Sequence, residues 1–149
     1  MPDRPNVLSS MRSLLEEKAV RARAELAELD QASAQETKSS AGDKYETARE
    51  MIAQARELQS SVLGGTQLGI EWLERQDPSR TCGSIALGAI FQTSDGWFLA
   101  CPLPMEIPLR DGSVQGISLQ SPLGQCLKGA SAGGTRVFRG KTVQILAVV

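Results

Sequence analysis

The sequence of 149 residues contains no histidine, and its three cysteines are widely spaced. Without histidine, Ser-His and Cys-His nucleophilic catalysis are excluded, and the commonest nitrogen ligand of zinc is missing. Cys82, Cys101 and Cys126 form no Cys-x-x-Cys pair, so we expect small buried thiols rather than a disulfide framework or a metal centre. The sequence thus argues against an enzyme built on these side chains.

Aromatic residues are also scarce, at 4% of the chain, and no apolar run approaches the 18 residues of a membrane span. The net charge is −1, which gives no overall basic signal for nucleic-acid binding. The first residues, Met-Pro-Asp-Arg-Pro, do not resemble a secretion signal. We therefore expect a cytoplasmic protein that has no membrane partner.

The N-terminal segment shows an apolar stripe of helical period. Pro5 suits the first turn of a helix, and neither Gly nor Pro interrupts residues 6–35. The stripe is narrow and rich in alanine, which favours a two-helix seam over a globular core. It consists of Leu8, Met11, Leu15, Ala19, Ala22, Leu26 and Leu29. The pattern predicts a helix over residues 5–35.

A second helix of comparable length is predicted over residues 41–76, after a polar turn near residues 36–43 in which Ser40 is the N-cap. Gly64-Gly65 could end this helix. However, an antiparallel partner must match the first helix in length, and an interior Gly costs only about 1 kcal/mol. We therefore expect the helix to continue to Asp77-Pro78. Its predicted seam is Ala48, Ile52, Ala55, Leu58 and Val62.

Composition changes at Pro78, after which charges become few and Gly and Pro frequent. Turns are predicted at Ser94-Asp95-Gly96 and Asp111-Gly112, and a short helix is opened by Ser121-Pro122 and closed by Gly129. Strands are predicted over residues 84–93, 97–101, 106–110, 114–118, 135–138 and 142–149. The fold class is therefore α+β: an antiparallel coiled-coil finger in residues 1–77 and a mostly antiparallel β domain in residues 78–149.

Two short segments resemble known motifs. Ser121-Pro-Leu-Gly-Gln-Cys-Leu-Lys-Gly129 is similar to the Ser-Pro-(Leu/Ile)-Gly-x-x-Leu-x-Gly segment of the GreA/GreB family of bacterial transcript cleavage factors. Gly42-Asp-Lys-Tyr-Glu-Thr47 resembles the family's acidic finger tip, Gly-Asp-x-x-Glu-Asn. The resemblance implies an N-terminal coiled-coil finger and a C-terminal FKBP-like domain.

The resemblance also implies a function, namely binding in the secondary channel of bacterial RNA polymerase. Asp43 and Glu46 match the two acidic tip positions, which would help to hold a Mg²⁺ shared with the polymerase active site for cleavage of backtracked RNA. The protein would then be an accessory factor rather than an enzyme. It would have no cofactor of its own, meet nascent RNA only indirectly and act as a monomer.

Several alternatives stay open. An alignment anchored on Tyr45 and Ala48-Arg49-Glu50 places Lys38 and Ala41 at the acidic positions, which would describe a regulator that occupies the channel without cleavage. Asp43 could simply cap its helix, and Glu46 and Glu50, which share its face, could be solvated surface. A peptidyl-prolyl isomerase is a third reading, although it needs an aromatic-lined pocket.

Overall fold

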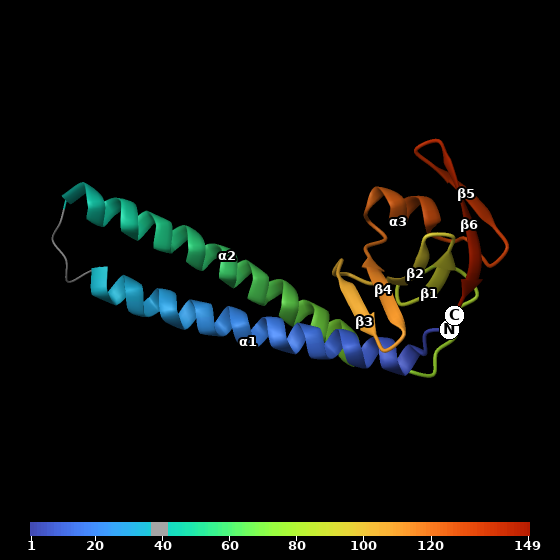
Figure 1. The fold of residues 1–149 in the computed structure, drawn as a ribbon, viewed down its shortest axis with the longest axis horizontal. Helices are drawn as coiled ribbons and strands as arrows, with labels where there is room; N and C mark the ends of the chain where they lie inside the picture. The colour runs from blue at the N-terminus through green and yellow to red at the C-terminus, as the bar shows by residue number, and fades with distance from the viewer. Residues whose placement is uncertain (37–41) are drawn as a thin grey trace. The chain divides into compact units, whose positions relative to one another are not determined.

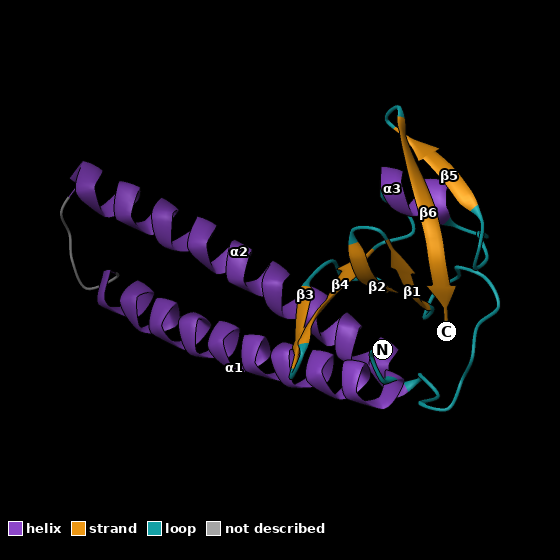
Figure 2. Ribbon diagram, turned by 45° about the vertical axis from the view of Figure 1, so that its right-hand side comes forward, coloured by secondary structure: helices purple, strands orange, loops and turns teal. Residues whose placement is uncertain are grey.

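A computed structural model describes residues 1–36 and 42–149 (Figure 1). Two helices, α1 (Arg4–Glu36) and α2 (Gly42–Glu74), are each 33 residues long. They run antiparallel and side by side in both views (Figures 1 and 2), which confirms the predicted helical hairpin. The helix α2 is continuous through Gly64-Gly65, also as predicted. None of the helices in the described residues is long and apolar enough to cross a membrane.

The predicted stripe of α1 is confirmed: its residues are buried from Leu8 to Ala22 and half-buried at Leu26 and Leu29. The predicted stripe of α2 is only partly right, because Leu58 and Val62 are 62% and 39% exposed. Gln59 and Leu63 take the inward positions instead. From Ala55 the half-buried positions follow at steps of four residues, at Gln59 and Leu63. Leu58 and Val62 each precede one of these positions by one residue, which turns their side chains away by about 100°.

The helix α2 ends three residues before the predicted stop at Asp77. The amides of Arg75 and Gln76 bond to the carbonyls of Trp72 and Leu73, at N–O distances of 3.2 and 3.0 Å. These bonds span three residues instead of four, so the last turn tightens and the helix closes before Pro78 is reached.

A six-stranded sheet follows, with strand order β3-β4-β2-β1-β6-β5. Neighbouring strands are antiparallel except for the parallel pair β2 and β4. The short helix α3 (Pro122–Leu127) lies between β4 and β5 in the sequence, so the predicted mostly antiparallel sheet with one short helix is confirmed. The strands are β1 (Ile90–Thr93), β2 (Gly96–Ala100), β3 (Glu106–Leu109), β4 (Gly112–Ile117), β5 (Thr135–Phe138) and β6 (Lys141–Val148).

The strand predicted over residues 84–93 is wrong in its first half, since only residues 90–93 form β1. Gly88 has φ +91°, a conformation outside the strand region. Before it, the amide of Ile85 bonds to the carbonyl of Ala130 in the loop after α3. Ile85 and Ala89 are thus buried from within a loop, whereas Leu87 is exposed, and the alternation of the sequence does not reveal this.

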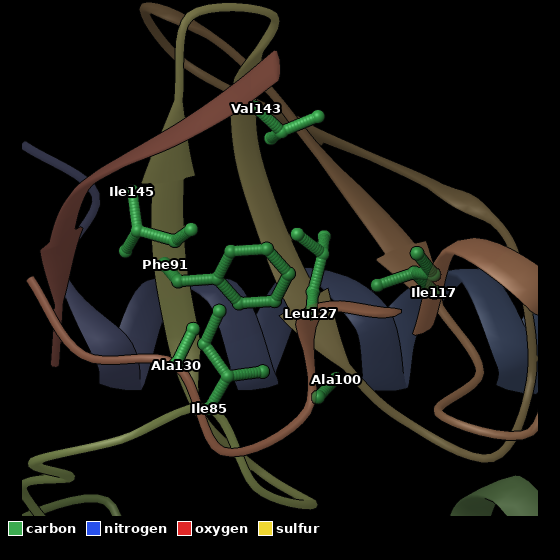
Figure 3. Close-up of a cluster of buried hydrophobic side chains, with 8 residues drawn as sticks. All are labelled: Ile85, Phe91, Ala100, Ile117, Leu127, Ala130, Val143 and Ile145. Carbon is green, nitrogen blue, oxygen red and sulfur yellow. The ribbon is translucent and has the colours of Figure 1, made fainter. Parts of the chain in front are cut away.

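The core of this part is a cluster of apolar side chains between the sheet and α3 (Figure 3). The ring of Phe91 is buried and stacks on that of Phe98, with centroids 5.3 Å apart. Burial of one such side chain stabilises a fold by about 1.5–3 kcal/mol. The cluster consists of Ile85, Phe91, Ala100, Ile117, Leu127, Ala130, Val143 and Ile145.

The chain divides into two compact units, residues 15–70 and residues 1–14 with 71–149. Within the second unit, the start of α1 is tied to the residues around the sheet. The buried Arg4 guanidinium donates to the carbonyls of Asp77 and Gly88 at 2.9 and 2.6 Å, and the Ser10 hydroxyl donates to the carbonyl of Pro108 in β3. The predicted domain division between residues 77 and 78 stays a prediction.

Candidate functional site

The candidate site is the first two turns of α2, at the end of the helix that follows residues 37–41 in the sequence. Asp43 is the second residue of α2, so its backbone is helical, whereas its side chain lies outside the described part of the structure. Lys38, Ser40 and Ala41 lie outside the described residues altogether. The tip near residues 36–43, the Ser40 cap and both alignments of the acidic positions therefore stay predictions.

Glu46 and Glu50 are exposed, and a spacing of four residues places both on one face of α2. Tyr45 beside them is half-buried, and Lys44 is exposed. In the part of the chain that the structure describes, Glu46 takes part in no ion pair. Its carboxylate is thus presented to solvent rather than engaged in holding the hairpin together.

One or two carboxylates at a helix end could provide part of a Mg²⁺ site, because this ion commonly takes few carboxylates and keeps several waters. Within residues 1–36 and 42–149, no three His, Cys, Asp or Glu side chains are grouped closely enough to hold a metal ion.

The hairpin supports this site with modest packing. Ala48, Ile52 and Ala55 of α2 are half-buried, as is Leu29 of α1. An ion pair joins the Arg56 guanidinium of α2 to the Asp30 carboxylate of α1, and both side chains are about half exposed. Such exposed pairs contribute about 0–1 kcal/mol. The first turns of α2 therefore depend mainly on hydrogen bonds within the helix and only slightly on contacts between α1 and α2.

The second motif builds α3, and each of its characteristic residues has a folding role. Ser121 is the N-cap, and its hydroxyl oxygen accepts from the amide of Gly124 at 3.1 Å. The same hydroxyl donates to the carbonyl of Ser118 at 2.6 Å, and Pro122 occupies the first turn. Leu127 enters the core, and Gly129 ends the motif with φ +83°.

Gly124 is required by close approach, because a Cβ at this position would collide with the carbonyl oxygen of Ser118. No side chain larger than hydrogen fits there without moving the backbone. The resemblance in this segment is thus accounted for by a tight strand-to-helix connection. The motif is therefore evidence for the fold rather than for a function.

A cleft of about 850 Å³ lies in the unit that contains the sheet. Trp97 is the only aromatic residue among those lining it, beside Asp3, Asn6, Pro108 and Arg110. Phe91 is buried and stacked on Phe98 in the core, and Phe138 lies beneath Arg139. These phenylalanines therefore do not form the aromatic-lined pocket on which the isomerase reading depends.

Sequence reasoning missed a group of cations around Phe138. The Arg139 guanidinium carbon lies 5.0 Å from the centroid of the Phe138 ring, and Arg136 and Lys141 are on the same hairpin. A signal was present in the sequence, because Asp111 is the last acidic residue of the chain. The overall charge of −1 conceals this local excess.

Among known proteins, the chain shows similarity at the level of solved structures. No family model matches the chain, and no curated protein matches it. Among solved structures, the chain is similar to one described as the transcription factor Gfh1, with 16% identity, coverage of 93% of both chains and a TM-score of 0.39.

Proposed function

We propose that this chain is a Gre-type transcription elongation factor whose helical hairpin enters the secondary channel of bacterial RNA polymerase. There, Asp43 and Glu46 would stimulate cleavage of backtracked RNA by the polymerase. The observation that carries the proposal is the position of the acidic segment. It opens α2, the second of two antiparallel helices of equal length, and Glu46 is exposed there.

The geometry suits this role for a physical reason. A helix rises 1.5 Å per residue, so a hairpin of two 33-residue helices can carry side chains at its turn about 50 Å along a narrow channel. Two-metal hydrolysis uses a second Mg²⁺ to stabilise the attacking and leaving oxygens. Asp43 and Glu46 would supply carboxylate ligands, and the polymerase would supply the first metal and the remaining ligands.

A second function uses the same hairpin without the chemistry. If Tyr45 and Ala48-Arg49-Glu50 align with the family tip, Lys38 and Ala41 occupy the acidic positions. The protein would then occupy the channel, compete with other factors and cleave nothing. The two functions share a binding mode and differ only in the tip, so one experiment can separate them.

The experiment measures RNA cleavage in stalled, backtracked complexes of a bacterial polymerase, with the full chain or its variants added. Asp43→Asn and Glu46→Gln retain size but remove charge. We expect each to lower the cleavage rate by orders of magnitude, because a neutral amide does not offset the charge of Mg²⁺. Raising the Mg²⁺ concentration should partly restore the single variants.

Glu50→Gln is the matched control, because it removes a carboxylate one turn further along the same face. We expect it to leave cleavage nearly unchanged, and all three variants should bind polymerase like the original chain. Loss of a helix-capping charge at Asp43 costs only about 0.3–1 kcal/mol, so helicity should persist. Equal cleavage by the original chain and both tip variants would refute the catalytic role. Binding without cleavage by the original chain would favour the regulator.

A further inference from the structure

The C-terminal quarter of the chain differs in charge from the rest. Residues 112–149 contain four basic residues and no Asp or Glu, so the other 12 basic residues and all 17 acidic residues precede Gly112. This segment therefore has a net positive charge, whereas the residues before it have a net negative charge. The four basic residues are Lys128, Arg136, Arg139 and Lys141.

Three of these cations, Arg136, Arg139 and Lys141, belong to the β5–β6 hairpin, whose two strands are labelled in Figure 2. Arg136 and Phe138 are two residues apart on β5, and Phe138 is paired with Lys141 of β6, so these three side chains share one face. The Arg139 guanidinium carbon lies 5.0 Å from the centroid of the Phe138 ring. We call this group, Arg136, Phe138, Arg139 and Lys141, the cationic hairpin surface.

Most of the charge on this surface is unpaired. Lys141 forms an exposed ion pair with Asp95 at 3.6 Å, whereas Arg136 and Arg139 have no ion-pair partner among the residues that the structure describes. Arg136 donates from Nη1 to the carbonyl of Thr135 at 3.3 Å, which leaves most of its N–H donors available. Two guanidinium groups are therefore free to receive carboxylates.

The backbone at Arg139 indicates that arginine is not there to favour the turn. Arg139 has φ +52° and Gly140 has φ +79°, and Arg139 is the only residue other than Gly with positive φ in the described chain. A two-residue hairpin loop with positive φ at both positions favours Asn or Asp before Gly. Arginine is strained in this conformation, and such strain is a sign of function when the side chain is placed for contact. Stacking on Phe138 holds the guanidinium in place before any partner arrives.

Two carbonyls of β5, the last strand of the sheet order, are already bonded to side chains of this chain. The carbonyl of Thr135 is bonded to Arg136, and the carbonyl of Val137 accepts from the Cys126 thiol of α3 at 3.3 Å. A partner therefore cannot extend the sheet through these two carbonyls. This favours recognition through the side chains of the cationic hairpin surface.

We propose that the cationic hairpin surface docks an acidic segment of a partner polypeptide, with two or three carboxylates received by Arg136, Arg139 and Lys141. Guanidinium groups pair with carboxylates through two parallel hydrogen bonds, which suits a compact cluster of acids. A nucleic acid is a poorer fit, because a phosphate chain requires a longer basic track and the Phe138 face is already covered by Arg139. This inference does not depend on the proposed function.

The test is an NMR titration of the isotope-labelled full chain at low salt with a capped octaglutamate peptide. We expect saturable shifts centred on residues 135–141. Arg139→Asn should weaken binding about threefold and Arg136→Gln/Arg139→Asn about tenfold, as expected for losing one and two exposed charge contacts. Arg139→Asn should also keep or raise the melting temperature, because Asn suits the turn. This separates loss of binding from loss of folding.

Arg110→Asn is the matched control, since Arg110 is an exposed turn residue of the β3–β4 hairpin, at the opposite end of the strand order. It should leave octaglutamate binding unchanged. The proposal is overturned if the shifts fall outside the β5–β6 hairpin, or if Arg110→Asn weakens binding as much as Arg139→Asn does. It is also overturned if an eight-nucleotide oligouridylate binds residues 135–141 more tightly than octaglutamate.

Discussion

The sheet unit and the helical hairpin are stabilised in different ways. In the sheet unit, Phe91, Leu99 and Ile145 have no exposed area, so burial of apolar surface dominates. In the hairpin, full burial ends at Ala22, and further toward the turn Leu26 and Leu29 are only half-buried. Helices with so few contacts depend on intrinsic propensity and open locally at low cost. Glu46 is therefore carried by the less firmly held region of the protein.

The largest expected effect is in the sheet unit. Phe91→Ala removes a buried ring that stacks on Phe98, and it should lower the free energy of unfolding by about 3–5 kcal/mol. Amide hydrogen exchange of β1, β2 and β6 should accelerate, while exchange in residues 24–55 should change little. Equal acceleration in both regions would show that the two units unfold together.

The hairpin can be divided by a pair of matched substitutions. Leu15→Ala empties a fully buried position and should cost about 2–4 kcal/mol, whereas Leu26→Ala empties a half-buried one and should cost less than half as much. Chemical denaturation followed by circular dichroism measures both. If Leu26→Ala proves as costly as Leu15→Ala, close packing continues to Leu26 and the two positions do not differ in burial energy.

The stability of the sheet unit should depend on pH in the alkaline range. Burial raises the pKa of the Cys101 thiol from 9.0 to about 11. Above pH 9 the unfolded chain loses this proton while the folded chain keeps it. The unfolding free energy should therefore fall between pH 9 and 11, by at most about 2–3 kcal/mol. Denaturation series across this range should show a shallower decline in Cys101→Ala. The same slope in both proteins would contradict the assignment.

The smallest expected effect is a gain in the hairpin. A Cβ at Gly64 or Gly65 would meet no atom within 4 Å, and neither residue has positive φ. Gly64→Ala and Gly65→Ala should therefore each stabilise α2, by about 1 kcal/mol or slightly less. Gly124→Ala is the contrasting control, because its Cβ would collide with the Ser118 carbonyl. Thermal melting of the three variants should show two increases and one decrease. A decrease at Gly64 would mean that this glycine is needed for folding.

Local signals predicted most of the fold. The helices followed from apolar residues at steps of three and four, and α3 followed from Ser121-Pro122 with Gly129 after it. The wrong predictions concern residues whose conformation or burial is determined by tertiary contacts. Residues 84–89 alternate like a strand, but the turn at Gly88 makes them a loop. Leu58 and Val62 are apolar yet face solvent, because the seam passes through the polar Gln59.

For the candidate site, local spacing predicted the shared helical face of Glu46 and Glu50, while its chemistry stays a prediction. The spacing of Glu46 and Glu50 placed both on one helical face, and the structure shows them exposed there. What they would bind depends on ligands outside the chain, which no local pattern encodes. The cationic hairpin surface could not be assembled from spacing alone, because it requires the pairing of Phe138 with Lys141 and the position of the Arg139 side chain.

The glycines of the hairpin give its two helices different bending stiffness. The helix α1 contains no glycine, and its single proline, Pro5, lies in its first turn. The helix α2, in contrast, contains Gly64, Gly65 and Gly69 within six residues. The Thr66 hydroxyl beside them donates to the carbonyl of Val62 at 2.8 Å, a bond that tends to bend helices. In elastic terms the hairpin is a stiff rod beside a compliant one, so a sideways load on its turn would be absorbed mainly by flexure of α2 around residues 62–69.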